Sequence, residues 1–170
     1  MTTVSALSLV NATLDSVADL VSWLRDDAGL EPGQAAELSL RLAGFLELRA
    51  VLLDLFDAAI HGRALPEDAV GRLNETSARV PRVARLGDDG SSLEPIASSG
   101  APLVLAEIAW SAIDLLGGPD RERLRRCGAD GTIFVATRPD RVWCSDRCGN
   151  RIRVARHHAR VRTPTYPVRG

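Results

Sequence analysis

Two stretches of the chain, Arg126-Cys127-Gly128-Ala129-Asp130 and Trp143-Cys144-Ser145-Asp146-Arg147-Cys148-Gly149-Asn150-Arg151, decide how its C-terminal part folds. They hold all three cysteines of the protein: two form a C-x-x-x-C knuckle, and the third lies 17 residues upstream. Thiols gathered from two short segments are typical of a structural metal site, which usually needs a fourth ligand. Asp130 stands close behind the first cysteine. We therefore expect a metal ion to tie these two stretches together.

The composition is that of a globular protein with an aliphatic core. Of the 170 residues, 45% are hydrophobic and 25% charged, which argues against disorder, and only 4% are aromatic. No apolar run approaches the roughly 20 residues of a membrane span. The N-terminus, Met1-Thr2-Thr3-Val4-Ser5, lacks the basic and apolar regions of a signal peptide. We expect a cytoplasmic protein, in which clustered cysteines bind metal more often than they form disulfides.

The charges are distributed unevenly along the chain. Residues 1–120 hold 8 arginines and 18 acidic residues, a net charge of −10, whereas residues 121–170 hold 13 arginines and 4 acidic residues, a net charge of +9. There is no lysine, so part of the arginine content reflects general residue usage. An acidic body with a basic C-terminal part predicts an anionic partner for the latter. In the alternative interpretation, the basic part pairs with the acidic body.

Apolar spacing predicts a mainly α N-terminal part with one β-hairpin. Residues 7–10 alternate and suggest a short strand or an extended lead-in, whereas i, i+3, i+4, i+7 spacing predicts helices over about 15–28, 34–60, 66–77 and 102–116. Arg49 falls in the apolar stripe of the longest helix, where we expect it to pair with a carboxylate. Residues 82–86 and 93–97 flank a turn and predict the hairpin.

The C-terminal part is predicted to be a small knuckle–hairpin–helix module. A short helical lead over 121–126 precedes Cys127, strands over 132–136 and 141–143 form a hairpin, and Cys148 begins a helix. Because so small a module has a thin core, a metal would have to supply much of its stability. The sequence thus predicts a helical domain over 1–120, the finger-like module over 121–163 and an extended tail over 164–170.

These residues resemble two known families. The finger module is similar to the CGNR zinc finger in Phe134 and in the motifs Trp143-Cys144-Ser145 and Cys148-Gly149-Asn150-Arg151. Residues 1–120 resemble the ABATE domain that accompanies this finger, in Val10-Asn11, Leu20-Val21-Ser22-Trp23-Leu24, Leu48-Arg49-Ala50-Val51-Leu52 and the approach Leu124-Arg125-Arg126-Cys127. The resemblance implies a bacterial transcriptional regulator whose finger binds zinc and DNA.

The finger departs from its family at one ligand, since Asp130 takes the place of the second of four cysteines. Three interpretations remain open. Asp130 supplies a carboxylate oxygen beside Cys127, Cys144 and Cys148, or His157 or His158 folds back as the fourth ligand. A straight helix carries these histidines roughly 14 Å from Cys148, which is too far. In the third interpretation the metal is lost, and packing by Phe134, Trp143 and Ile152 holds the fold.

The helix after Cys148 has the residues of a nucleic-acid contact. Arginines at 3–4 spacing share one face, and forked guanidinium groups can track phosphates and contact guanine edges. The candidate contacts are Asn150, Arg151, Arg153, Arg156, His157 and Arg160. We expect DNA as the partner, with the helical domain forming a homodimer or sensing a small-molecule effector.

No group of residues has the spacing of a catalytic triad, a phosphate loop or a carboxylate pair, which argues against an enzyme without excluding one. The competing hypothesis comes from another functional class. In it the altered finger is only structural and binds no DNA, while the helical domain binds a small molecule or serves as an enzyme or enzyme accessory.

Overall fold

The structure is a computed structural model that describes residues 5–88, 90–96 and 100–162, without the side chains of 160–162. The extended tail predicted over 164–170 lies outside these described residues. The chain divides between Glu122 and Arg123 into an N-terminal unit and a C-terminal unit. The mainly α prediction is confirmed, because the described residues form seven α-helices and only two two-stranded sheets. None of the described helices is both long and apolar enough to cross a membrane.

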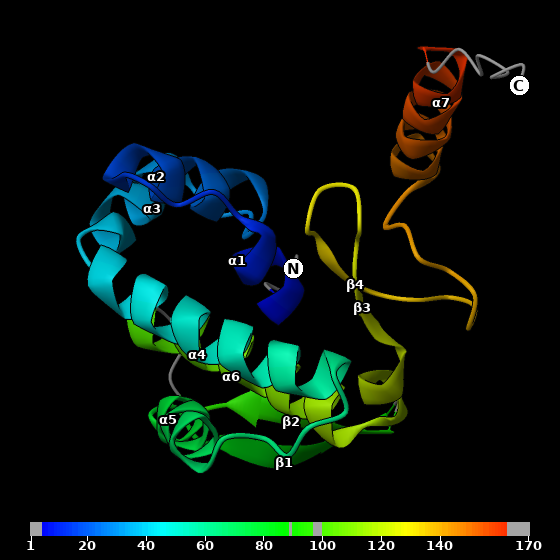
Figure 1. Ribbon diagram of the computed structural model, residues 1–170. Helices are drawn as coiled ribbons and strands as arrows, with labels where there is room; N and C mark the ends of the chain where they lie inside the picture. The colour runs from blue at the N-terminus through cyan, green and yellow to red at the C-terminus, as the bar shows by residue number, and fades with distance from the viewer. Residues whose placement is uncertain (1–4, 89, 97–99, 163–170) are drawn as a thin grey trace, which may run out of the picture. The chain divides into compact units, whose positions relative to one another are not determined.

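The N-terminal unit is built around two long helices that lie side by side. Figure 1 shows α4 and α6 together, with α1 on one side of the pair and α5 on the other. The α-helices of this unit are α1 (Ala6–Asn11), α2 (Val17–Asp26), α3 (Pro32–Ser39), α4 (Leu42–Ile60), α5 (Glu67–Ala78) and α6 (Ala101–Gly117).

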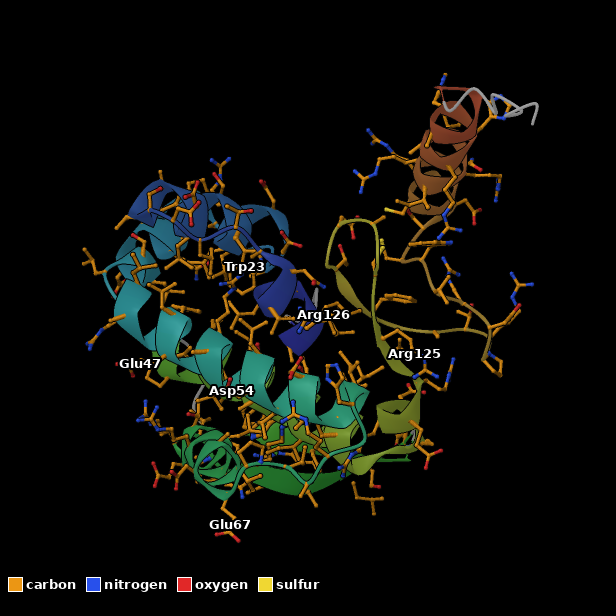
Figure 2. The ribbon with its side chains drawn as sticks, in the orientation of Figure 1. Trp23, Glu47, Asp54, Glu67, Arg125 and Arg126 are labelled. Carbon is orange, nitrogen blue, oxygen red and sulfur yellow. The ribbon has the colours of Figure 1, made fainter. Side chains whose placement is uncertain are left out.

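The core of this unit is aliphatic with a few rings, as the composition predicts. The side chains of Phe45, Leu52, Leu55 and Phe56 on α4 are fully buried, as is Ile108 of α6, and α4 packs against α1 and α6. Trp23 points into this unit and meets Phe45 edge to face, whereas Glu67 at the start of α5 projects outward (Figure 2). Burial of each such large side chain contributes about 1.5–3 kcal/mol.

The prediction of a strand or extended lead-in at residues 7–10 is wrong, because they lie in α1. The Ser5 hydroxyl accepts a hydrogen bond from the Ser8 backbone N–H and so caps the helix. The Ala6 backbone N–H donates to Ser111 Oγ of α6 at 2.7 Å, which fixes the start of α1 against a helix 105 positions later. Leu9 and Val10 are buried by this packing.

The single helix predicted over 34–60 is two helices in the structure. α3 ends at Ser39, and α4 begins at Leu42 after a turn at residues 40–41. Ser39 Oγ donates to the Ala36 carbonyl oxygen, and Leu40 is 83% exposed. The turn lets both α3 and α4 turn apolar faces to the core, which one straight helix cannot do.

The carboxylate partner predicted for Arg49 is absent from the residues that the structure describes. In the described part of the chain this arginine forms no ion pair, and its Nη2 donates to the Val10 carbonyl oxygen at 3.4 Å. Its Nε is buried without a hydrogen-bond partner. The guanidinium thus lies against the C-terminal end of α1, where backbone carbonyls carry partial negative charge.

The β-hairpin predicted in this unit is confirmed. β1 (Arg82–Gly87) pairs antiparallel with β2 (Gly90–Pro95), with Arg82 opposite Pro95 and Ala84 opposite Leu93. Arg82 lies over the Trp110 ring of α6, 3.6 Å from its centroid, and Trp110 Nε1 donates to the Ser77 carbonyl oxygen. The first contact joins the hairpin to α6, and the second joins α6 to α5.

The C-terminal unit has a knuckle, a short hairpin and a helix, but its strands differ from the prediction. A 3₁₀ helix, η1 (Pro119–Arg123), leads into β3 (Leu124–Arg126), so the helical lead predicted over 121–126 is only partly right. β3 pairs antiparallel with β4 (Ile133–Val135), with Arg125 opposite Phe134. Residues 141–143 form no strand. The unit ends with α7 (Asp146–Arg162). Arg125 and Arg126 project from β3 (Figure 2).

Candidate metal centre

Four side chains of the C-terminal unit converge on one point. Cys127, Asp130, Cys144 and Cys148 each offer a ligand atom, and these atoms all lie within 4.8 Å of one another. Cys127 and Asp130 come from the turn between β3 and β4, Cys144 precedes α7, and Cys148 lies in the first turn of α7. Cys127 and Cys148 are buried, whereas Asp130 is exposed. The cluster thus joins three chain segments.

Two of the separations within the cluster are close to those around a tetrahedral zinc ion. Around zinc, bonds of about 2.3 Å to sulfur and 2.0–2.2 Å to oxygen place two sulfurs about 3.8 Å apart and a sulfur and an oxygen about 3.5 Å apart. Cys144 Sγ lies 3.5 Å from Cys148 Sγ and 3.6 Å from Asp130 Oδ2. Cys148 Sγ and Asp130 Oδ2 are closer, at 2.9 Å. Three thiols and one carboxylate form a donor set that suits zinc.

The turn after β3 aims Cys127 and Asp130 inward. The Cys127 backbone N–H donates to the Thr132 carbonyl oxygen, and the Gly131 N–H donates to the Cys127 carbonyl oxygen. Gly131 has φ of +78°, a conformation that L side chains rarely adopt. Asp130 Oδ1 accepts from the Thr132 backbone N–H at 3.1 Å, which leaves Oδ2 facing the thiols.

The start of α7 aims the second pair of thiols. Ser145 Oγ accepts from the Cys148 backbone N–H at 3.3 Å, as a helix cap does, and the Gly149 N–H donates to the Ser145 carbonyl oxygen. Cys148 therefore points back toward Cys144. Together with the β3–β4 turn, this helix start brings all four ligand atoms together.

Hydrogen bonding shifts the proton affinities of the cluster. The nearby Asp130 carboxylate raises the pKa of the Cys148 thiol to about 11. Hydrogen bonds from Cys148 and Cys127 hold the pKa of Asp130 well below its usual range. Burial acts to raise the pKa of Cys127, but N–H groups of Cys144 and Ala129 outweigh it and lower that pKa. Without a metal, the centre is therefore a carboxylate hydrogen-bonded by thiols.

Trp143 lies between two glycines beside the cluster. A Cβ atom on Gly128 would come within 3.1 Å of Trp143 Cζ3, and one on Gly149 within 3.0 Å of Trp143 Cδ1. Both glycines directly follow a cysteine of the cluster. The indole thus packs where the two knuckles approach each other, and a side chain at either glycine would crowd it.

Arg141 fixes the loop that carries Trp143. Its Nε donates to the Trp143 carbonyl oxygen, its Nη2 to the Cys144 carbonyl oxygen and its Nη1 to Thr137 Oγ1, at 2.9–3.2 Å. This side chain takes the role that ladder hydrogen bonds would have in the strand predicted over 141–143. All three acceptors are neutral, so the positive charge of Arg141 is not compensated by them.

The predicted nucleic-acid contacts lie on α7, and most of them are exposed. Asn150, Arg153, Arg156 and His157 are exposed, while for Arg160 only the backbone position in α7 is described. Arg153 Nη1 donates to Asn150 Oδ1, and His157 and His158 are in edge contact. Arg151 is also exposed, and it donates to the Ala129 carbonyl oxygen and so ties α7 to the knuckle turn.

Two family models match the chain. One matches residues 4–119 and is described as ABATE, "Putative stress-induced transcription regulator", and the other, the CGNR zinc finger, matches residues 123–161. The first alone covers more than half of the 170 residues. The chain belongs to the ABATE family. No curated protein matches the chain. The two ABATE and CGNR matches favour a regulatory, nucleic-acid-binding protein.

Each residue of the CGNR tetrapeptide has its own contact in this structure. Cys148 is in the metal cluster, and Gly149 lies against the Trp143 ring. Asn150 accepts from Arg153, and Arg151 donates to the Ala129 carbonyl oxygen. The motif thus joins the metal cluster, the aromatic packing and the basic face of α7 within one helical turn.

The expected cofactor is supported by both the CGNR match and the cluster, which is consistent with zinc. Asp130 is the residue that the structure brings to the three cysteines. His157 and His158 do not belong to this cluster among the described residues. The interpretation in which a histidine folds back would therefore need a different course of α7.

Sequence reasoning missed two supports of the centre. It named Trp143 only as a packing residue and assigned Arg141 to a strand. The glycines next to Cys127 and Cys148 were the available signal, because paired glycines beside ligands indicate a close approach of another group. The hydrogen bonds of Arg141 leave no trace in apolar periodicity, so nothing in the sequence pointed to them.

Proposed function

We propose that this ABATE–CGNR protein is a DNA-binding transcriptional regulator whose finger contacts DNA through α7. The observation that carries the proposal is the uncompensated charge of that helix. Arg153 and Arg156 are exposed on one face, and no arginine from 138 to 156 forms an ion pair with an acidic residue in the described part of this unit. Such a face attracts phosphates and gives up counterions on binding.

In this proposal zinc is a structural ion held by Cys127, Asp130, Cys144 and Cys148. Its contribution is folding free energy, since it joins three segments of a unit whose own core is small. It orients α7 with respect to the β3–β4 hairpin. Metal analysis of protein purified without added zinc tests this assignment. A zinc content near zero with α7 and the hairpin still folded would refute it.

The DNA contact is tested by the salt dependence of binding. The full chain is titrated against a labelled duplex of mixed sequence at several salt concentrations, and affinity is followed by fluorescence anisotropy. The Arg153→Ala/Arg156→Ala variant should reduce the slope of log K against log salt by about 2, because each lost phosphate contact removes about 0.9. An unchanged slope would refute the contact face.

A matched control removes two exposed arginines from the N-terminal unit. Arg25→Ala/Arg72→Ala changes the net charge by the same amount, but both residues lie on helices of the other unit. Its slope should equal that of the unaltered protein. A loss as large as that of the α7 variant would show that net charge, and not the face of α7, governs binding.

For the N-terminal unit we propose dimerisation or the sensing of a small effector. Transcriptional regulators commonly bind two half-sites, and their protein symmetry then matches the symmetry of the DNA. Light scattering on the full chain across a concentration series distinguishes the two roles. A dimer at every concentration supports the first role, whereas a monomer throughout leaves effector sensing.

A further inference from the structure

A groove lies beside the start of α7 in the C-terminal unit. It has a volume of about 590 Å³ and lies between the 138–143 loop and α7. Its lining includes three arginines, one from α7 and two from the loop, together with Trp143 and Asn150. The arginines are Arg138, Arg141 and Arg153. Of these, only Arg153 belongs to the DNA contacts proposed from the sequence.

The guanidinium groups of this groove form no hydrogen bond with a charged group among the described residues. Arg141 donates only to two carbonyl oxygens and one hydroxyl, and Arg153 donates to the Asn150 amide oxygen. The Arg138 side chain is exposed and has no hydrogen-bond or ion-pair partner within the described residues. Forked guanidinium groups with unused donors are well suited to bind an oxyanion.

A neutral donor adds to this set. Trp143 lines the groove, and its Nε1–H has no acceptor in the described part of the chain. Because Gly128 and Gly149 hold the indole from both sides, this donor is fixed in position. A fixed N–H group costs little ordering entropy when it donates to a ligand.

The net charge of the groove limits what it can bind. Two carboxylates, Asp140 and Asp146, also line it, so three guanidinium groups and two carboxylates leave one positive charge. A phosphodiester carries a single negative charge, whereas a phosphate monoester carries nearly two at neutral pH. The carboxylates repel the second charge more than they repel the first.

We propose that this groove binds one phosphodiester of the DNA backbone, next to the contacts made by the face of α7. The inference rests on the proposed DNA-binding function and extends it. Arg138 and Arg153 grip the phosphate from the loop and from the helix, and Trp143 Nε1 donates to it. The contact fixes the position of the finger along the backbone and carries no sequence preference, as phosphate contacts do.

The test uses Arg138→Ala in the full chain, with Arg147→Ala as the matched control. Both residues are exposed arginines of the same unit, but Arg147 does not line the groove. Binding to a duplex of mixed sequence is measured over a range of salt concentrations. Arg138→Ala should lower the salt slope by about 1. Arg147→Ala should leave it unchanged.

Folding measurements and a second variant, Arg138→Lys, separate a loss of the phosphate contact from a disturbed fold. Because Arg138 has no side-chain partner in the described residues, its removal should change neither the zinc content nor the circular dichroism of the chain. Arg138→Lys keeps the charge but loses the fork, so it should restore most of the slope with weaker binding. If Arg138→Ala leaves the slope intact while Arg153→Ala/Arg156→Ala lowers it, the groove proposal falls and the DNA-binding function stands.

Competition with inorganic phosphate tests whether the groove binds a phosphodiester of DNA or the free phosphate ion. At constant ionic strength, millimolar phosphate should not displace the duplex from the unaltered protein. If phosphate displaces DNA and Arg138→Ala abolishes that competition, the groove prefers the free ion and the phosphodiester proposal is overturned. If the unaltered chain binds no duplex at low salt, the proposed function itself is refuted.

Discussion

Cys148 Sγ lies 2.9 Å from Asp130 Oδ2, although 18 positions of the chain separate the two residues. Asp130 belongs to the turn after β3, and Cys148 to the first turn of α7. Their contact is therefore a tertiary one and marks where the two knuckles close on each other. It also identifies the carboxylate as the fourth side chain of the centre, in place of the cysteine that the family resemblance implies.

Asp130→Cys should tighten zinc binding, and Asp130→Ala should weaken it. The first variant restores four thiolates, which zinc binds strongly, whereas the second leaves three ligands. We expect Asp130→Ala to cost at least the roughly 10-fold that lost supporting groups cost other zinc sites. Competition with a chromophoric chelator measures both affinities.

The control for this series is Asp140→Ala, which removes a carboxylate of the same unit that is not in the cluster. Its zinc affinity should match that of the unaltered chain. Equal affinities for Asp130→Ala and Asp140→Ala would show that Asp130 is not a ligand.

Zinc binding should release a proton from Cys148 at neutral pH. The Asp130 carboxylate raises the pKa of this thiol to about 11, so without metal the thiol is protonated. A ligating sulfur must be a thiolate, and affinity therefore falls as the pH is lowered. For each proton that zinc binding releases, the zinc affinity falls about tenfold when the pH is lowered by one unit.

Zinc affinities measured at about pH 6, 7 and 8 test this expectation, since every protonated ligand adds to the slope. Cys148→Ser provides the comparison, because it removes the thiol with the raised pKa and should flatten the dependence. A pH-independent affinity of the unaltered chain would contradict the protonation state that we assign.

Gly149→Ala should destabilise the C-terminal unit. The new Cβ would stand within 3.0 Å of Trp143 Cδ1, so the indole or α7 must shift, at a cost of about 1–3 kcal/mol. Chelator-induced unfolding of the zinc-loaded protein, followed by tryptophan fluorescence, measures the loss.

Gly71→Ala is the matched substitution in α5. A Cβ at Gly71 meets nothing within 4 Å, and alanine favours the helix by up to about 1 kcal/mol. The two variants should therefore change stability in opposite directions. A gain at Gly149 as well would mean that Trp143 does not occupy the space between the glycines.

Glu107→Gln should stabilise the N-terminal unit at neutral pH. Burial raises the pKa of the Glu107 carboxyl, and the positive charge of Arg82 offsets this only in part. A group whose pKa is raised on folding loses its stabilising contribution as the pH rises through the folded value. Above that value, the ionised carboxylate opposes folding, and glutamine avoids this.

Thermal unfolding midpoints of the unaltered chain and of Glu107→Gln, measured across pH, test the direction of the Glu107 pKa shift. The advantage of Glu107→Gln should shrink as the pH falls below 4.5, the ordinary pKa of the group, where the carboxyl is neutral in both folded and unfolded chains. An advantage that persists unchanged at low pH would contradict the raised pKa.

Local patterns were sufficient for most helices, for the β1–β2 hairpin and for the candidate centre. The spacing of Cys127, Cys144 and Cys148 indicated a metal site, and Asp130 was visible as an unusual neighbour. These features depend on residues close in the chain or on ligand chemistry, and both are legible in one sequence.

The errors arose where distant contacts decide local structure. Residues 7–10 are helical because Ser5 caps α1 and because Ser111 of α6 accepts a hydrogen bond from its first residue. Arg49 donates to a backbone carbonyl oxygen, although a carboxylate partner was expected. The finger hairpin pairs β3 with β4 across the knuckle turn, and Arg141 hydrogen-bonds to carbonyl groups of the loop that follows. Hydrogen bonds of this kind leave no periodic signal.

The hydrogen bond from Ala6 to Ser111 also orders events during synthesis. The first helix leaves the ribosome 105 positions ahead of the serine that receives it. At about 5–20 residues per second, this interval lasts roughly 5–20 s. Throughout this interval α1 lacks its packing contacts with α6. Before α6 has emerged, the side of α1 that packs against α6 is therefore uncovered and accessible to chaperones.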